Sequence, residues 1–181
     1  MTSIDQGRVA AFLTAGETAA SNAARGKAFE DLVTYLFELV PGISATVRNQ
    51  LDYFSSEEID IAFWNEGDPR GLRQFDKIIL VECKNWSKPV GAPEVTLFST
   101  KLEERGRPLG VLVAAAGITG EAADLKAAHQ VLARALWQKR EILVVTSSEI
   151  AQLSDTDDLV RLLKRKRLQL AVSGTIYGVS G

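Results

Sequence analysis

Three charged residues at the ends of two apolar segments have the types and spacing for metal-dependent hydrolysis. Glu82 and Lys84 end the apolar run 78–81, which is typical of a buried strand, and they share one face because side chains alternate along a strand. Asp60 lies in an earlier strand candidate, 58–64, on the face opposite its apolar neighbours. If these strands are adjacent, the three side chains meet. Two carboxylates and a lysine are suited to holding Mg²⁺ and hydrolysing a phosphodiester bond.

The composition of the chain excludes several kinds of metal site and of catalysis. The chain has 181 residues, of which 46% are hydrophobic, enough for one domain with a real core. One cysteine, Cys83, excludes a disulfide framework, a four-cysteine zinc site and an iron–sulfur cluster within one chain. One histidine, His129, excludes a multi-histidine metal site and argues against histidine-centred catalysis. The net charge of −2 argues weakly against indiscriminate nucleic-acid binding.

Segments that would direct the chain to a membrane are not found in the sequence. No apolar run approaches the roughly 20 residues that cross a bilayer. Residues 1–5 lack the basic and apolar regions of a signal peptide, so we expect a cytoplasmic protein. The chain also lacks a phosphate-loop motif and a dinucleotide-binding fingerprint, and we expect it to bind no nucleotide cofactor.

The elements that must position the three charged residues follow from periodicity. A helix from 26 to 40, stopped by Pro41 and Gly42, precedes strands at 43–49, 58–64 and 77–84, which suggests an antiparallel meander. Strands and helices then alternate, which predicts parallel pairing. The expected elements are a helix at 93–105, a strand at 109–116, a helix at 121–139, a strand at 142–146, a short helix capped by Ser147 or Ser148, and a helix at 157–168. The predicted fold is α/β, with a mixed sheet flanked by helices.

We divide the chain into three parts. Residues 1–24 are expected to form an N-terminal helical extension, with a short helix at 6–13. Residues 25–170 form the main domain, and residues 171–181 form a short C-terminal tail.

The order of several short motifs resembles the Mrr-like branch of the PD-(D/E)xK restriction endonuclease superfamily. The similarity extends over about residues 26–153 and rests on Gly26-Lys27-Ala28-Phe29-Glu30, Ile59-Asp60-Ile61, Val81-Glu82-Cys83-Lys84 and Lys88-Pro89-Val90-Gly91. The resemblance implies that 25–170 is a nuclease domain with a restriction-endonuclease-like core. It also implies a Mg²⁺-dependent endonuclease acting on DNA, with Mn²⁺ as a substitute, in restriction or defence against foreign DNA.

The same resemblance implies a role for each motif residue. Asp60 and Glu82 would be metal ligands, and the backbone carbonyl of Cys83 would complete the metal shell. Lys84 would position the attacking water and stabilise the transition state, and Glu30 would be an auxiliary acid. Many Mrr-like members carry Gln at the position of Glu82, whereas Glu matches the wider superfamily.

Basic residues provide a candidate nucleic-acid surface, although each one taken singly is equally well explained as an ordinary solvated side chain. They are Lys27, Arg73, Lys77, Lys88, Lys101 and Arg105. Lys27, Lys77 and Lys88 lie nearest the triad in sequence. We favour packing over base stacking for Trp86. By analogy with the family, we expect a homodimer.

Other interpretations remain open. The charged cluster can be a buried structural ion pair, although the ordered motifs favour a catalytic site. The enzyme can instead be a structure-specific resolvase or an RNase of the same fold. A catalytically silent module that binds nucleic acid or protein is the alternative outside enzymes.

Overall fold

One mixed sheet organises the molecule, as the sequence predicts. The structure is a computed structural model that describes residues 1–51, 58–118 and 122–174. Its five-stranded sheet has the order β1-β2-β3-β4-β5, with antiparallel pairing from β1 to β3 and parallel pairing from β3 to β5. The strands are β1 (Ile43–Leu51), β2 (Glu58–Asn65), β3 (Ile78–Lys84), β4 (Leu109–Ala114) and β5 (Glu141–Val145).

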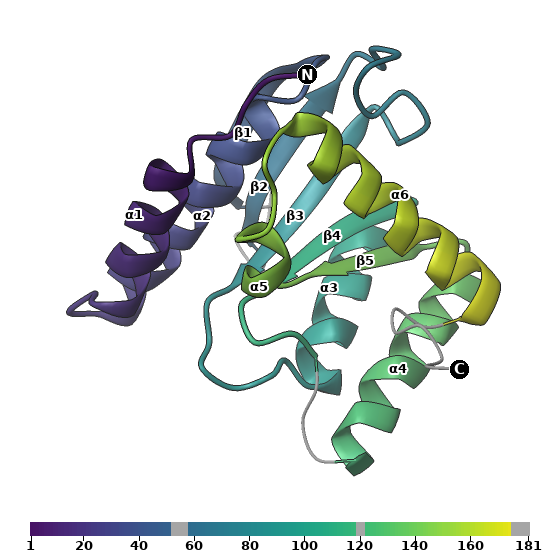
Figure 1. Ribbon diagram of the computed structural model, residues 1–181. Coiled ribbons are helices and arrows are strands. Elements are labelled where there is room, and N and C mark those ends of the chain that lie inside the picture. Colours follow the sequence, from purple (N-terminus) through teal and green to yellow (C-terminus); the bar gives the residue numbers. More distant parts are fainter. Residues whose placement is uncertain (52–57, 119–121, 175–181) are drawn as a thin grey trace.

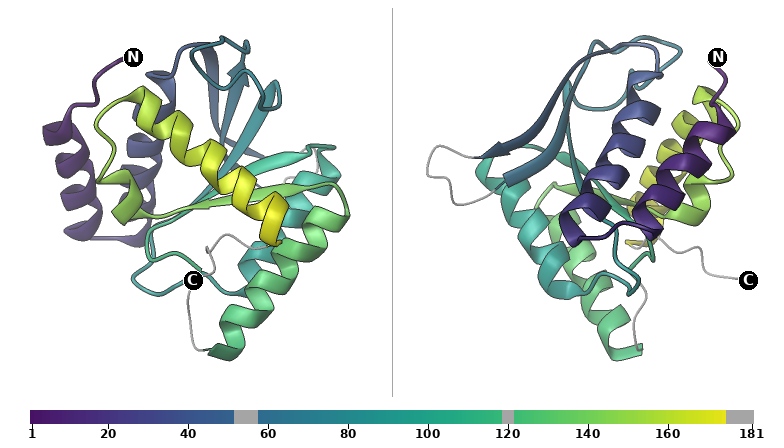
Figure 2. Two further views of the ribbon diagram at one scale, coloured as in Figure 1. Left: turned by 45° about the vertical axis from the view of Figure 1, so that its right-hand side comes forward. Right: turned by 90° about the vertical axis from the view of Figure 1, so that its left-hand side faces the viewer.

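Helices cover both faces of this sheet (Figures 1 and 2). Helix α2 (Asn22–Glu38) and helix α6 (Thr156–Ser173) lie on one face, with α1 (Gln6–Glu17) packed on the outer side of α2. Helix α3 (Ala92–Glu104) and helix α4 (Ala122–Trp137) lie on the other face, and the short α5 (Ser147–Ile150) follows β5. The expected α/β architecture is therefore confirmed.

Side-chain alternation separates the core from the charged cluster. Phe63 of β2 stacks on Phe37 of α2, with ring centroids 4.7 Å apart, so the odd-numbered residues of β2 face α2. Asp60 consequently lies on the face toward α3. That helix approaches closely because β4 carries Gly110, where a Cβ would stand 2.6 Å from the ring of Phe98. A larger residue there would push α3 away from the sheet.

Capping residues explain why several helices differ from the predicted ranges. Asp5 and Ser21 accept hydrogen bonds from Arg8 and Ala24, so α1 and α2 begin at these caps. The prediction that Ser147 or Ser148 caps the short helix is wrong, because Thr146 forms the capping box there.

The last helix is longer than predicted. It continues through Ser173 and ends at Gly174, whose φ of 66° is the left-handed conformation that glycine favours at a helix end. Residues 171–173, which we assigned to the tail, are therefore helical, whereas 175–181 lie outside the described residues. Among the described helices, none is long and apolar enough to cross a membrane.

The N-terminal residues are joined to the main body. Ile4 and Val9 are buried in the same hydrophobic core as the sheet. The N–H of Ile4 donates to the carbonyl of Ser154 at 3.0 Å, and Ser3 forms a β-bridge with Asp155. The division of the chain at residue 24 stays a prediction, but this extension is packed against the sheet domain rather than separate from it.

Candidate active site

The two carboxylates lie on adjacent strands at the same end of the sheet. Ile61 pairs with Val81, so Asp60 and Glu82 occupy the next position along the antiparallel ladder. Oδ2 of Asp60 accepts a hydrogen bond from the backbone N–H of Cys83 at 2.7 Å. That bond fixes the Asp60 carboxylate beside the Cys83 peptide, whose carbonyl we predicted as a metal ligand.

Two lysines hold Glu82, which is only 2% exposed. Nζ of Lys84 lies 2.7 Å from Oε1 of Glu82. Nζ of Lys101 lies 3.0 Å from Oε1 and 2.9 Å from Oε2. The desolvation cost of a buried carboxylate is offset here by three charge-assisted contacts from two lysines. The structure thus brings Asp60, Glu82 and Lys84 together and adds a second lysine.

Electrostatics distinguish Asp60 from Lys84. Burial, together with the nearby charge of Glu82, raises the pKa of Asp60 to about 6. Burial alone would lower the pKa of Lys84, but the charge of Glu82 and its hydrogen bond outweigh burial and raise that pKa above its ordinary value. Lys84 is therefore a cation at neutral pH, suited to stabilising negative charge and unsuited to taking a proton from water.

Lys101 does not lie where we predicted. We expected it on a DNA-binding surface, but it is 6% exposed and paired with Glu82, so that prediction is wrong. The signal was present in the sequence, since Lys101 follows Phe98 by three residues and precedes Leu102, both on the inward face of α3. A lysine on the buried face of a helix requires a buried partner.

Glu30 has a partner that the sequence analysis missed. Its Oε2 lies 3.0 Å from Nη2 of Arg48 on β1, and Arg48 also binds Asp31. The role of Glu30 as an auxiliary acid stays a prediction. Burial and the charges of Asp60 and Glu30 raise the pKa of the Cys83 thiol well above its usual range. The thiol is therefore protonated and is a poor metal ligand. The backbone carbonyl of Cys83 remains the group that we predict as a ligand.

The predicted basic surface divides between the two ends of the sheet. Lys77 and Arg73 lie in the connection between β2 and β3, at the far end of these strands from Asp60. The carbonyl of Lys77 accepts from the N–H of Asn65, about 17 Å along β2 from Asp60 at about 3.4 Å per residue. Lys77 is thus close to the charged cluster in sequence but lies at the other end of the sheet, and its contact with DNA stays a prediction.

The other basic residues lie closer to the cluster. Lys88 is exposed in the loop that follows β3. Lys27 is exposed near the start of α2, at the end of the sheet where the carbonyl of Arg25 accepts from the side chain of Asn85. Arg105 is half-buried one turn beyond Lys101 on α3. Lys27 and Lys88 are the predicted DNA contacts with a position suited to that role.

Trp86 is more exposed than a packing role requires. Its side chain is 43% exposed, and its ring centroid lies 5.9 Å from Nζ of Lys84. The indole therefore borders the charged cluster while leaving part of its surface in solvent.

The donor set fits a cation that needs few protein ligands. Within the described part of the chain, no three or more His, Cys, Asp or Glu side chains group to hold a metal ion. Mg²⁺ is commonly bound through one or two carboxylates and keeps several waters, so Asp60 and Glu82 suffice. Burial and, second to it, the repulsion from Glu82 raise the pKa of Asp60, and a divalent cation between the two carboxylates would relieve that repulsion.

Comparisons with known proteins identify a family for this chain. A family model described as "Restriction endonuclease", the Mrr catalytic domain, matches residues 21–163. A search of curated proteins finds no match. Among solved structures, the small subunit (R.BspD6I2) of the heterodimeric restriction endonuclease R.BspD6I is similar over 96% of this chain and 82% of its own, with 16% identity and a TM-score of 0.46. That likeness is too distant to support a functional assignment.

Proposed function

This chain belongs to the restriction endonuclease family, and from that premise we propose that it is a divalent-metal-dependent endonuclease that hydrolyses phosphodiester bonds in DNA. We further propose Mg²⁺ as the ion, with Mn²⁺ as a substitute. The observation that carries the proposal is the cluster of Asp60, Glu82 and Lys84 at one end of β2 and β3. These are the residue types that metal-assisted phosphodiester hydrolysis requires.

Each residue of the cluster has a part in this proposal. Asp60, Glu82 and the main-chain carbonyl of Cys83 would hold the ion. A bound divalent ion supplies a water of lowered pKa and neutralises charge on the phosphate. Lys84 places a fixed positive charge beside the scissile phosphate, where negative charge develops. Lys101 contacts both oxygens of Glu82 and sets the orientation of that carboxylate, as a positioning residue.

A plasmid assay tests the proposal. Purified protein is incubated with supercoiled plasmid in Mg²⁺, Mn²⁺ or EDTA, beside Asp60→Asn, Lys84→Met and, as a matched lysine control at the far end of the sheet, Lys77→Met. We expect nicked or linear product only with metal, normal cleavage by Lys77→Met, and at least about a hundredfold loss in the other two variants. Cleavage that persists in Asp60→Asn and Lys84→Met would refute the assigned site.

The alternatives are separated by the substrate and by metal binding. Preferred cleavage of branched DNA or of RNA in the same assay would indicate a resolvase or an RNase. Glu82 held by two lysines also suits a silent module in which the cluster is only structural. That module predicts no cleavage and no binding of Mg²⁺ by calorimetry, whereas a nuclease site binds the ion even without DNA.

The remaining expectations are finer proposals. We propose that two copies associate so that two sites meet one duplex, which sedimentation velocity tests directly as a mass of about two chains. Monomers at micromolar concentration, both with and without DNA, would contradict this. We propose a role in restriction of foreign DNA from the family resemblance, and a cytoplasmic location from the sequence features that led us to expect it.

A further inference from the structure

A pocket of about 550 Å³ opens where the parallel strands end. Part of its lining follows β3, β4 and β5 directly: Asn85, Trp86, Ser87, Ala115, Ala116, Ser147 and Ser148. Open α/β sheets bind ligands outside the carboxyl ends of their strands. The volume falls in the range of about 300–1,000 Å³ that is usual for small-ligand pockets.

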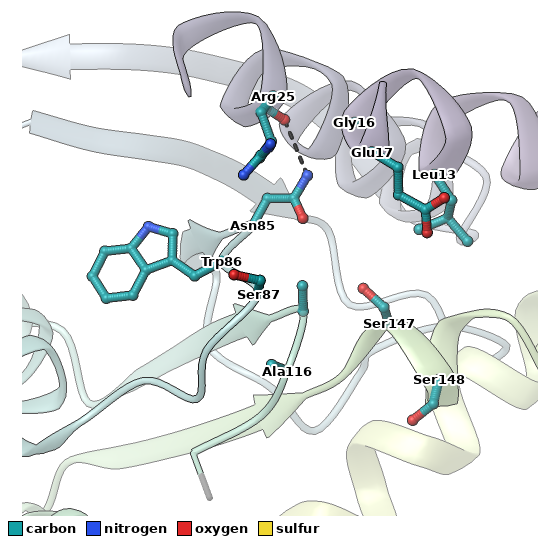
Figure 3. Close-up of a pocket in the computed structure, with 11 residues that line it drawn as sticks. Leu13, Gly16, Glu17, Arg25, Asn85, Trp86, Ser87, Ala116, Ser147 and Ser148 are labelled. Atoms are coloured by element: carbon teal, nitrogen blue, oxygen red, sulfur yellow. Dashed lines mark hydrogen bonds between the residues drawn. The ribbon is translucent and has the colours of Figure 1, made fainter. Parts of the chain in front are cut away.

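Helix α1, which lies outside the family match to residues 21–163, builds one wall of this pocket through Leu13, Gly16 and Glu17. Gly16 packs against Asn85 so closely that a Cβ would lie 2.6 Å from Nδ2 of that residue. Nδ2 of Asn85 also donates to the carbonyl of Arg25 at 3.2 Å. The Asn85 oxygen is left facing the pocket (Figure 3).

The lining combines a cation, an aromatic ring and polar groups. Arg25 brings a guanidinium whose buried Nε has no hydrogen-bond partner among the described residues. Trp86 brings a partly exposed indole that also borders Lys84. Ser147 and Ser148 bring hydroxyl groups on the other side. An anion with a flat, hydrogen-bonding ring satisfies all of these groups at once.

Resting on the proposed nuclease function, we propose that this pocket binds one unpaired nucleotide of the DNA strand that passes Lys84. Its base stacks on Trp86 and its phosphate pairs with Arg25. Arg25 and Trp86 come from one side of the pocket and Glu17 from another, so repulsion by Glu17 directs the phosphate toward Arg25 (Figure 3). Ser and Asn groups then meet the edges of the base.

Binding without metal tests the pocket independently of cleavage. A fluorescein-labelled single-stranded oligonucleotide is titrated with full-length protein in EDTA, and anisotropy is measured for wild type, Trp86→Ala, Arg25→Met and Glu17→Gln. Trp137→Ala is the matched control, because Trp137 is 84% exposed at the end of α4 and does not line the pocket. Circular dichroism checks that each variant is folded.

We expect Trp86→Ala to weaken binding by about fivefold to a hundredfold, the range that loss of one stacked base gives. Arg25→Met also weakens binding, Glu17→Gln strengthens it, and Trp137→Ala leaves it unchanged. Unchanged binding by folded Trp86→Ala overturns the proposal even if Arg25→Met does not fold. Thymidine 5′-monophosphate, thymidine and inorganic phosphate are competitors, and equal competition by phosphate alone would replace the nucleotide site by a simple anion site.

The two proposals fail separately. Trp86-dependent binding by a protein that cleaves no plasmid would support the pocket and refute the nuclease. Plasmid cleavage that needs Asp60 but is accompanied by Trp86-independent binding would support the nuclease and refute the pocket.

Discussion

Asp60 shows that a residue suited to catalysis is a disadvantage to the metal-free fold. Its pKa of about 6 in the folded protein lies above its ordinary value of 3.8. The folded state therefore binds the proton more tightly than the unfolded chain. As far as Asp60 determines it, the free energy of unfolding is highest below pH 4, and it falls as the pH rises from about 4 to about 6. Above pH 6 the loss is constant, at about 3 kcal/mol.

The prediction is that Asp60→Asn stabilises the protein in EDTA at pH 7.5 by about 2–3 kcal/mol while abolishing cleavage. The amide removes the buried charge and keeps an oxygen for the Cys83 N–H. Urea unfolding at pH 7.5 and pH 4 measures the effect, which shrinks toward zero at the lower pH. An equal gain at both values would show that the charge of Asp60 is not its source.

Lys101 gives a second prediction at the residue scale. In Lys101→Met, Glu82 keeps Lys84 but loses its partner at Oε2, so we expect the free energy of unfolding to fall by about 1–3 kcal/mol. Lys88→Met is the matched control and should change it by less than about 0.5 kcal/mol, because Lys88 is exposed. The double variant Glu82→Gln with Lys101→Met should recover part of the loss. Additive effects in that cycle would mean that the two residues are not coupled.

Two helical glycines test how α1 and α2 support the site. Gly26 of α2 has open space where a Cβ would stand, so Gly26→Ala should stabilise the protein by about 0.5–1 kcal/mol. At Gly16 of α1, a Cβ would collide with the side chain of Asn85. Gly16→Ala should therefore give no such increase in stability, and it should move the Asn85 amide out of the pocket wall. Thermal unfolding and oligonucleotide binding measure both effects. If Gly16→Ala were as stable as Gly26→Ala and bound the oligonucleotide normally, α1 would have no role in shaping the pocket.

Elements were more predictable than their relations in space. Apolar runs bounded by turn residues placed β2 and β3 within a residue of their observed bounds, because strand periodicity is a local property. Alternation then predicted that Glu82 and Lys84 share a face. Lys77 is near the triad in sequence but not in space. It directly precedes β3, whereas Glu82 and Lys84 end that strand, and an extended strand separates its two ends.

Partners between distant elements were the hardest to foresee. Arg48 of β1 and Glu30 of α2 pair because α2 packs on the meander, a contact that no single-sequence pattern specifies. The sequence predicts a short N-terminal helix only at 6–13, whereas α1 continues to Glu17. Gly16 is buried against Asn85, and its lack of a side chain allows α1 to pack closely on that residue.

At the scale of the whole molecule, the sheet has one end that carries the charged cluster and one that does not. Asp60, Glu82 and the pocket lie at the end where β3, β4 and β5 finish, and Lys88 follows β3 at this end. Lys77 and Arg73 lie at the opposite end. The net charge of −2 adds no general attraction for DNA, so binding depends on where individual cations lie.

Position along the sheet therefore predicts which lysine contacts DNA. Lys88→Ala should weaken binding of duplex DNA and lower the slope of log affinity against log salt by about 1, the value for one lost phosphate contact. Lys77→Ala, which removes the same charge, should leave both quantities unchanged, because its Nζ donates to the carbonyl of Glu66 at the other end of the sheet. Anisotropy titrations in EDTA at several salt concentrations make the comparison. Equal losses in the two variants would mean that the duplex spans the full length of β2 and β3, and the cluster would no longer define where DNA binds.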